Sequence, residues 1–311
     1  MTKPFLNYQQ QIEKLVNEKQ LIIRDVPFAE RKLRELGYFT LIGGYKDVFR
    51  NSNCRLFRDG TCFEDIYATY VFDNSLRELV FKYICYVEKK LRSLISYAFC
   101  EQYGELQVEY LNISNYNVTN HNRRDINKLI QILDRLANCN TDSEYLIYQR
   151  NKYRNVPLWV LVNALTFGQL SKMYLFLQFR IKSRVSCNFS NVNERELAQY
   201  LKVLVLYRNV CAHNERLFSR RVYSEIPDTI IHKKLGIDKM GTQYKVGKKD
   251  LFSVIIALRY LLPREDFLAF KKVLGGLLRK YLQECNLIDE SELLEKMGLP
   301  NNWKNISRYK L

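Results

Sequence analysis

The residues whose types and spacing could carry out a reaction lie close together near position 210. Arg208 is followed by Asn209, and His213 comes five residues after the arginine. Histidine takes up and releases a proton near neutral pH, and arginine presents a planar fork of N–H groups that suits phosphate oxygens. Such a pair can promote cleavage of RNA by its own 2′-hydroxyl, because the substrate supplies the nucleophile and the protein supplies proton transfer and fixed positive charge.

Helix geometry favours part of this grouping. Asn209 and His213 are four residues apart, so on a helix they share a face, and the Asn209 amide could orient the imidazole. Arg208 points about 140° away from His213 on an ideal helix. A long side chain or a fraying last turn is therefore needed to bring the guanidinium to the same phosphate. An Arg and His pair at a helix end is more often a surface or capping feature, so spacing alone leaves catalysis open.

Positive charge is concentrated around this motif. The chain of 311 residues has 49 Lys and Arg against 33 Asp and Glu, a net charge of +16, and residues 151–250 contribute +11 of it. The composition is that of a folded protein, 47% hydrophobic and 13% aromatic. A basic, aromatic-rich chain fits a polyanionic partner, and nucleic acid comes first among these, although a solvated basic surface would have the same charge.

The motifs of several other enzyme classes are missing from the sequence. Gly241 and Gly247, followed by Lys248 and Lys249, lack P-loop spacing, and neither Gly-x-Ser-x-Gly nor His-Glu-x-x-His occurs. Residues 151–250 contain 7 acidic residues and no tight cluster of them, which disfavours two-metal phosphate chemistry. The three histidines are far apart and lack neighbouring Cys or acidic ligands, so we expect no metal and no cofactor. Of these, His121 and His232 are expected to be ordinary solvent-facing residues.

The elements that must position the motif are expected to be helices. Gly and Pro total 18 of 311 residues, about half the usual share, and no strand-length alternating run stands out. We therefore predict an all-α fold. Helices are expected at residues 9–19, 28–36 (ended by Gly37), 124–137, 158–166, 169–178, 194–210, 251–261, 264–282 and 291–297, with residues 219–247 irregular.

The longest expected helical stretch precedes the motif. Thr61 and Glu64 form a capping-box pattern that predicts a helix start, and no Gly or Pro follows up to Tyr103. One helix of this length would span about 60 Å. We therefore expect a break near Phe72–Ser75.

Cysteine usage and hydropathy bear on the compartment. Eight cysteines form no Cys-x-x-Cys pair and mostly lie in apolar helical patterns, which is typical of reduced core thiols in a cytoplasmic protein. Residues 1–11 are polar and lack the apolar segment of a signal peptide. The longest uncharged stretch, residues 155–171, is interrupted by polar residues, Pro and Gly. We predict a cytoplasmic protein without a membrane segment.

The motif and its surroundings resemble known families. The hexapeptide Arg208-Asn209-Val210-Cys211-Ala212-His213 resembles the Arg-(x)4–6-His signature of HEPN ribonucleases, and the longer chain resembles the abortive-infection (Abi) family of bacterial phage-defence proteins, of the AbiD/AbiF type. The resemblance weakens after about Val222. The segments that carry it are Lys3-Pro4-Phe5, Gln11-Ile12, Leu36-Gly37-Tyr38-Phe39-Thr40-Leu41, Gly44-Tyr45, Phe63-Glu64-Asp65-Ile66, Phe72-Asp73, Leu76-Arg77, Glu88, Leu91-Arg92, Pro157-Leu158-Trp159 and Thr166-Phe167-Gly168-Gln169-Leu170-Ser171.

This resemblance implies a metal-independent endoribonuclease on a HEPN-type helical bundle. In HEPN enzymes two motifs meet at a dimer interface, and this chain has one, so the resemblance implies a homodimer with two copies of Arg208 and His213. Proteins of the AbiF type are paired with a small noncoding RNA, so a structured RNA is an expected partner beside the substrate RNA. The expected organisation is an N-terminal helical region (1–55), the bundle with the motif (56–222) and a C-terminal helical region (223–311).

Weaker candidates surround the motif. Glu88 and Arg77 could be inward-facing polar residues near the site, or could form ion pairs between helices. Tyr207 and Asn214 flank the motif and could contact RNA, although Tyr207 fits the core better. Basic residues that could contact phosphates are Arg216, Arg220, Arg221, Lys245, Lys248 and Lys249, although exposed lysines are commonly only a solubilising face.

Two other functions are consistent with the sequence. The first is a HEPN protein that binds a structured RNA and cleaves little, because aromatic stacking and phosphate contacts are sufficient for RNA affinity. The second is a protein-interaction or nucleotide-modifying component of a toxin–antitoxin pair.

Overall fold

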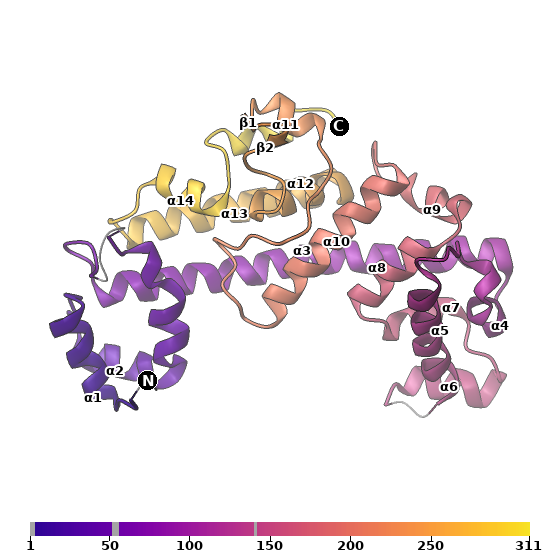
Figure 1. Cartoon of the computed structure of the whole chain (residues 1–311), viewed down its shortest axis with the longest axis horizontal. Helices are drawn as coiled ribbons and strands as arrows, with labels where there is room; N and C mark the ends of the chain where they lie inside the picture. The colour runs from indigo at the N-terminus through magenta and orange to yellow at the C-terminus, as the bar shows by residue number, and fades with distance from the viewer. Residues whose placement is uncertain (1–3, 52–55, 140–141) are drawn as a thin grey trace.

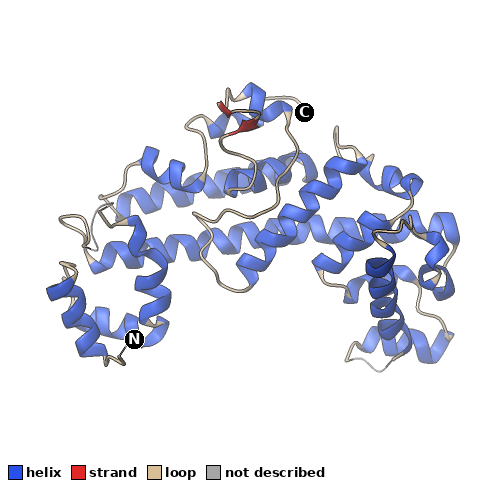
Figure 2. Cartoon of the chain, viewed as in Figure 1, coloured by secondary structure: helices blue, strands red, loops and turns tan. Residues whose placement is uncertain are grey.

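A computed structural model describes residues 4–51, 56–139 and 142–311 of the chain. Helices make up nearly all of the regular structure in these ranges, and the strands there are two short ones paired in a hairpin, β1 (Lys239–Met240) and β2 (Gln243–Tyr244) (Figure 2). The prediction of an all-α fold is confirmed.

The long helix α3 (Phe63–Tyr103) is the axis of the molecule (Figure 1). It runs for 41 residues without interruption, so the expected break near Phe72–Ser75 is wrong. This stretch contains no Gly or Pro, and Phe72, Asp73 and Leu76 are buried against other elements that hold it straight. The helix ends at Gly104, whose φ of 93° favours glycine.

The start of α3 differs from the expected capping box by one residue. Cys62 is the N-cap, and its N–H donates to the Asp65 carboxylate at 2.8 Å. The Thr61 hydroxyl donates instead to the carbonyl of Arg58 at 2.6 Å. Thr61 and Glu64 therefore do not form the predicted pair, because the loop geometry uses the hydroxyl elsewhere.

Short helices lie at one end of α3 (Figure 1). They are α1 (Tyr8–Glu13), followed by a π-helical turn (Lys14–Glu18), and α2 (Val26–Leu36). The Asp25 side chain caps α2, and Gly37, at a φ of 79°, ends it as predicted. A second π-helical turn (Phe39–Gly43) and a 3₁₀ turn (Lys46–Val48) follow. Part of the expected polar link, residues 52–55, lies outside the described residues.

A second group of helices surrounds the other end of α3 (Figure 1). The group consists of α4 (Gln107–Leu111), α5 (Arg123–Asn138), α6 (Glu144–Tyr153), α7 (Leu158–Leu161), α8 (Phe167–Phe176) and α9 (Phe179–Ser186). The expected helix over residues 158–166 ends early and continues as a 3₁₀ turn (Val162–Ala164). Sequence reasoning missed α4, α6 and α9. Only Leu146 of α6 is buried, so that helix has almost no apolar stripe to detect.

The helix that carries the motif, α10 (Glu194–Ala212), crosses α3 and also packs against α8, α9 and α12 (Figure 1). Its start is fixed by a capping box between Asn193 and Glu196. The C-terminal part contains α11 (Ile230–Lys234), α12 (Leu251–Leu261), α13 (Arg264–Glu284) and α14 (Glu290–Met297), and α13 packs along α3. Residues 219–247, expected to be irregular, thus contain α11 and the hairpin.

Buried side chains from all three expected regions belong to one continuous core, from Ile12 near the N-terminus to Ile306 near the C-terminus. The cysteines are divided between core and surface. Cys62, Cys211 and Cys285 are buried as expected, whereas the thiols at positions 139 and 187 are exposed, which corrects the expectation of core positions for those two. Cys54 lies outside the described residues.

The helices of the part of the chain that the structure describes were compared with the length and hydropathy of a membrane span. None of them is both long enough and apolar enough to cross a membrane.

Candidate active site at the end of α10

The motif lies at the C-terminal end of α10. His213 caps the helix, and its backbone N–H donates to the carbonyl of Asn209 at 2.9 Å. Asn214 then adopts a φ of 54°, a left-handed conformation that turns the chain away from the helix axis. Asn209, His213 and Asn214 are all exposed. The helix therefore presents an amide and an imidazole to solvent at its negative dipole end, where positive charge is favoured.

Arg208 lies at the contact between α10 and α3. Its guanidinium carbon is 5.7 Å from the centre of the Phe81 ring, so the aromatic face holds the charged group in place. Its Nε atom is buried and has no hydrogen-bond partner among the described residues, and no carboxylate there forms an ion pair with it. Because Nε is enclosed by the protein, a phosphate oxygen would have to accept from the terminal N–H groups of the guanidinium.

A buried carboxylate fixes the chain just after the motif. Asp73, on α3, accepts hydrogen bonds from the backbone N–H groups of Leu217 and Phe218 at 3.0 and 2.7 Å. It also accepts from the Tyr45 hydroxyl and from the Arg77 guanidinium, each at 2.8 Å. One side chain therefore joins three separate parts of the chain at the exit from the motif.

The contacts around Asp73 are protected from water. Burial raises the pKa of the Asp73 carboxyl, while the peptide N–H groups, Arg77 and Tyr45 act in the opposite direction. The Tyr45 ring stacks on Phe218 with ring centres 6.2 Å apart, and Arg77 also donates to the carbonyl of Glu215 at 3.3 Å. These interactions restrict the segment that follows His213.

Sequence reasoning missed Asp73 and Tyr45 as site residues. An Asp and an Arg four residues apart on the buried face of an apolar helix were the available indication. Arg77 was a candidate, but its ion pair is with Asp73 on the same helix and not between helices.

Glu88 also pairs within α3, with Arg92. The Arg92 guanidinium donates in addition to the carbonyls of Val162 and Leu165, the latter at 2.7 Å. Of the two alternatives for Glu88 and Arg77, the ion pair between helices is therefore wrong for both residues. The pair of Glu88 with Arg92 joins α3 to the segment before α8 and lies three turns of α3 beyond Arg77.

Tyr207 belongs to the core. Its hydroxyl lies within hydrogen-bond distance of the carbonyls of Arg220 (2.9 Å) and Lys249 (3.0 Å), so it joins α10 to two later loops. The ring is fully buried and is not available to stack on a base.

Most of the basic candidates after the motif are exposed and form a hydrogen bond or an ion pair within the protein. Arg216 donates to the carbonyl of Gly44 at 2.8 Å, and Arg220 lies 3.4 Å from Glu215. The remaining pairs are Arg221 with Asp250 (3.9 Å), Lys245 with Asp238 (3.5 Å) and Lys249 with Glu225 (3.6 Å). Such surface ion pairs are weak, so the basic side chain can leave its carboxylate partner and bind a phosphate instead.

Lys248 differs from the other basic candidates because it is buried. Its ammonium lies 2.6 Å from the Asp228 carboxylate and also donates to the carbonyl of Ile226. It therefore holds the segment before α12 in place and is not free to contact phosphate, contrary to the expectation.

A cleft of about 610 Å³ adjoins the motif on its C-terminal side. The π-helical turn Phe39–Gly43 forms one side of the cleft, and the loop after His213 forms the other. The Phe39 ring is 88% exposed. The charged side chains that line the cleft are Arg216, Arg220 and Arg221, with the carboxylates of Asp47 and Glu215. An exposed aromatic ring beside three guanidinium groups is a suitable surface for a nucleotide.

The two remaining histidines lie away from the motif. His121 is exposed. His232 is fully buried, which corrects the expectation, and it stacks on Tyr244 with ring centres 4.6 Å apart. Burial lowers the pKa of His232 to about 4. Within residues 4–51, 56–139 and 142–311, no three His, Cys, Asp or Glu side chains come together as a metal-binding group.

A family model described as Abi-like protein matches residues 31–219 of the chain. The matched span includes α3, α10, Asp73 and the whole Arg208–His213 motif. It begins after the N-terminal residues 3–12 where resemblance was expected, and it ends before α11. No curated protein and no solved structure matches the chain.

Proposed function

Because the chain belongs to the Abi-like protein family, we propose that it is an abortive-infection protein of phage defence and acts as a metal-independent endoribonuclease of the HEPN type. The observation that carries this proposal is the Arg208–His213 motif, which ends α10 with its histidine exposed and its arginine unpaired within the described residues.

The reaction that these residues support is transesterification of RNA. The 2′-hydroxyl of the substrate attacks the adjacent phosphorus and loses its proton, and the 5′-oxygen of the next nucleotide leaves and gains one. The imidazole of His213 moves a proton in this exchange. The guanidinium of Arg208 neutralises the charge that develops on the phosphorane oxygens. The products are a 2′,3′-cyclic phosphate and a 5′-hydroxyl.

The surroundings of the motif favour catalysis over a plain helix end. A catalytic constellation must be held within a fraction of an ångström of its working geometry. The Phe81 ring holds Arg208, and Asp73 holds the backbone of Leu217 and Phe218 four to five residues after His213.

A homodimer completes the proposed site. The chain contains one motif, and HEPN-type cleavage uses two. The exposed end of α10 is free to face its counterpart in a second copy, which would place two Arg208 and two His213 side chains around one phosphate.

The test is cleavage of RNA by the purified protein in the presence of EDTA. We expect wild type to cleave, and His213→Ala to lose at least about 100-fold in rate, the usual contribution of a general acid or base. His121→Ala, which removes the exposed histidine before α5, is the matched control and should cleave as wild type. Retained cleavage by His213→Ala would overturn the assignment.

A second function is binding of a structured noncoding RNA with little cleavage, as in a toxin controlled by its RNA partner. The cleft beside Phe39 with its three arginines favours it. RNA that co-purifies with sharp ends and binds wild type and Arg208→Ala equally, together with an absence of cleavage, would select this function.

A further inference from the structure

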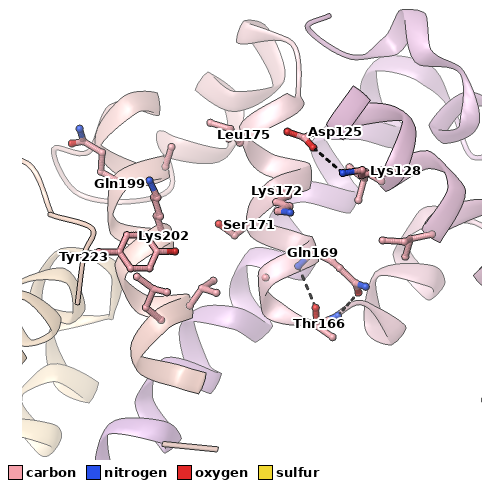
Figure 3. Close-up of a pocket in the computed structure, with 16 residues that line it drawn as sticks. Asp125, Lys128, Thr166, Gln169, Ser171, Lys172, Leu175, Gln199, Lys202 and Tyr223 are labelled. Carbon is pink, nitrogen blue, oxygen red and sulfur yellow. Dashed lines mark hydrogen bonds and ion pairs between the residues drawn. The ribbon is translucent and has the colours of Figure 1, made fainter. Parts of the chain in front are cut away.

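A groove of about 610 Å³ lies between α5, α8 and α10 (Figure 3). Lys202 and Tyr223 lie on one side of it, Asp125 and Lys128 lie on the other, and Lys172 projects from α8 between them. It is separate from the cleft beside Phe39, since the two share no lining residue.

Three of the groove's side chains are lysines, each from a different helix. Lys128, Lys172 and Lys202 are all exposed, and the carboxylate in the lining is Asp125, which lies 3.8 Å from Lys128. Among the residues that the structure places, no carboxylate forms an ion pair with Lys172 or Lys202. The groove therefore has an excess of positive charge that is not compensated inside the protein, and it is complementary to a polyanion.

The floor of the groove is apolar, and its rim carries an aromatic ring. Apolar side chains from three helices line it: Leu129 is buried, Ile132, Val205 and Leu206 are partly buried, and Leu175 is exposed. Tyr223 is 80% exposed at the rim, and the Lys202 ammonium lies 6.0 Å from the centre of its ring. Apolar and aromatic surface next to ammonium groups suits nucleotides, because bases stack on the surface and phosphates pair with the lysines.

The groove and the motif share one face of α10. Ala198, Lys202 and Val205 line the groove, and the same helical spacing of three and four residues continues to Asn209 and His213. Lys202 and His213 are eleven residues apart, which corresponds to about 16 Å along the helix. A strand of nucleotides can therefore run from the groove along α10 to the imidazole.

We propose that this groove binds a single-stranded segment of RNA a few nucleotides from the phosphate that His213 and Arg208 act on. The proposal rests on the proposed function, since it assigns a substrate subsite to the same reaction. It also predicts that the protein acts on single-stranded RNA, because a duplex would hide the bases from the floor and from Tyr223.

The experiment measures binding of a fluorescent single-stranded RNA oligonucleotide to protein carrying His213→Ala, so that the oligonucleotide stays intact. On this background, Lys172→Glu with Lys202→Glu should weaken binding at least tenfold and reduce the dependence of affinity on salt. Tyr223→Ala should weaken binding about fivefold or more through loss of stacking. Lys233→Glu with Lys272→Glu, exposed lysines of α11 and α13, changes the net charge equally and should alter affinity less than twofold.

The outcomes separate this proposal from the proposed function. If wild type cleaves RNA, and the groove substitutions change neither binding on the His213→Ala background nor cleavage in otherwise wild-type protein, the groove proposal is overturned and the ribonuclease stands. If the groove variants lose binding while wild type does not cleave, the groove binds RNA, and its role as a substrate subsite is overturned together with the nuclease. An equal loss in both lysine pairs would mean that affinity follows net charge alone, and it would also overturn the proposal. Unfolding temperatures close to that of wild type verify that each variant is folded.

Discussion

At the scale of single residues, the conformation of the loop after the motif depends on hydrogen bonds to one buried carboxylate, that of Asp73. Asp73 is fully buried, and its acceptors are occupied by two peptide N–H groups, a tyrosine and an arginine. A buried ion pair adds little net stability when it is complete, but removal of one member leaves an uncompensated charge. Asp73 therefore fixes the position of residues 215–218, and we expect its removal to lower the stability of the protein.

Asp73→Asn should destabilise the protein by about 3 kcal/mol, because Arg77 loses its counter-charge and the amide cannot accept all four hydrogen bonds. The measurement is equilibrium unfolding in urea. Asp47→Asn, at an exposed carboxylate 3.7 Å from Arg50, is the matched control and should change stability by less than about 0.5 kcal/mol. Equal effects of the two substitutions would contradict the assigned role of Asp73.

At the scale of elements, the sequence predicted the helices of more than ten residues in the described ranges, and the ones that it missed, α4, α6, α9 and α11, are shorter. The stretch from residue 251 to 261 matches α12 at both ends, because capping by Asp250 and an apolar run both define it. The break in α3 was expected from its length alone, and long-range packing removed it. The Asp73 contacts could not be predicted from local patterns, since Leu217 lies 144 residues away in sequence.

The hydrogen bonds that join α11 to the segment after the hairpin require His232 to be neutral. The N–H of Thr229 donates to Nδ1 of His232, and Nε2 lies 3.0 Å from the carbonyl of Gly247, which can only accept. The neutral ring with its proton on Nε2 satisfies both contacts, whereas a proton on Nδ1 would lose the first. This agrees with the lowering of the pKa of His232 to about 4.

His232 should therefore make stability depend on pH between about 4 and 6.5. Below 6.5 the unfolded chain takes up a proton that the native state refuses, so the contribution is complete above 6.5 and is lost as pH falls toward 4. Asp250, whose pKa burial raises to about 6, acts in the opposite direction, since the native state holds its proton more tightly.

The check is the free energy of unfolding of wild type and His232→Gln at several pH values. Because Asp250 is present in both proteins, the difference between them isolates the histidine. The variant should be less stable at pH 7 by an amount that shrinks toward pH 4, on the order of 3 kcal/mol across the window. A difference that does not vary with pH would show that His232 titrates alike in both states.

At the scale of the whole molecule, the net charge of residues 151–250 led to the expectation of a polyanion-binding surface there, and it did not distinguish free charges from paired ones. Two separate hollows, the cleft beside Phe39 and the groove on α10, are each lined by basic residues of this segment. Lys248 was counted with the surface charge although it is buried. Composition cannot tell an internal ion pair from a free lysine, because that depends on which carboxylate folds against it.

The proposed composite site makes activity depend on assembly. Specific activity should rise with protein concentration and follow the dimer fraction measured by analytical ultracentrifugation, because one chain contains one motif. Arg208→Ala should leave the dimer fraction unchanged while it removes cleavage. A monomer with full specific activity would contradict the homodimeric site.

The central claim, cleavage by the substrate's own 2′-hydroxyl without a metal, is tested most directly by the chemistry of the products. An RNA oligonucleotide is incubated with wild type in EDTA, beside the same oligonucleotide with 2′-deoxynucleotides at the mapped cleavage positions. We expect 2′,3′-cyclic phosphate and 5′-hydroxyl ends by mass spectrometry, and no cleavage at the deoxy positions. Products with 3′-hydroxyl ends, or equal cleavage of the deoxy substrate, would contradict it.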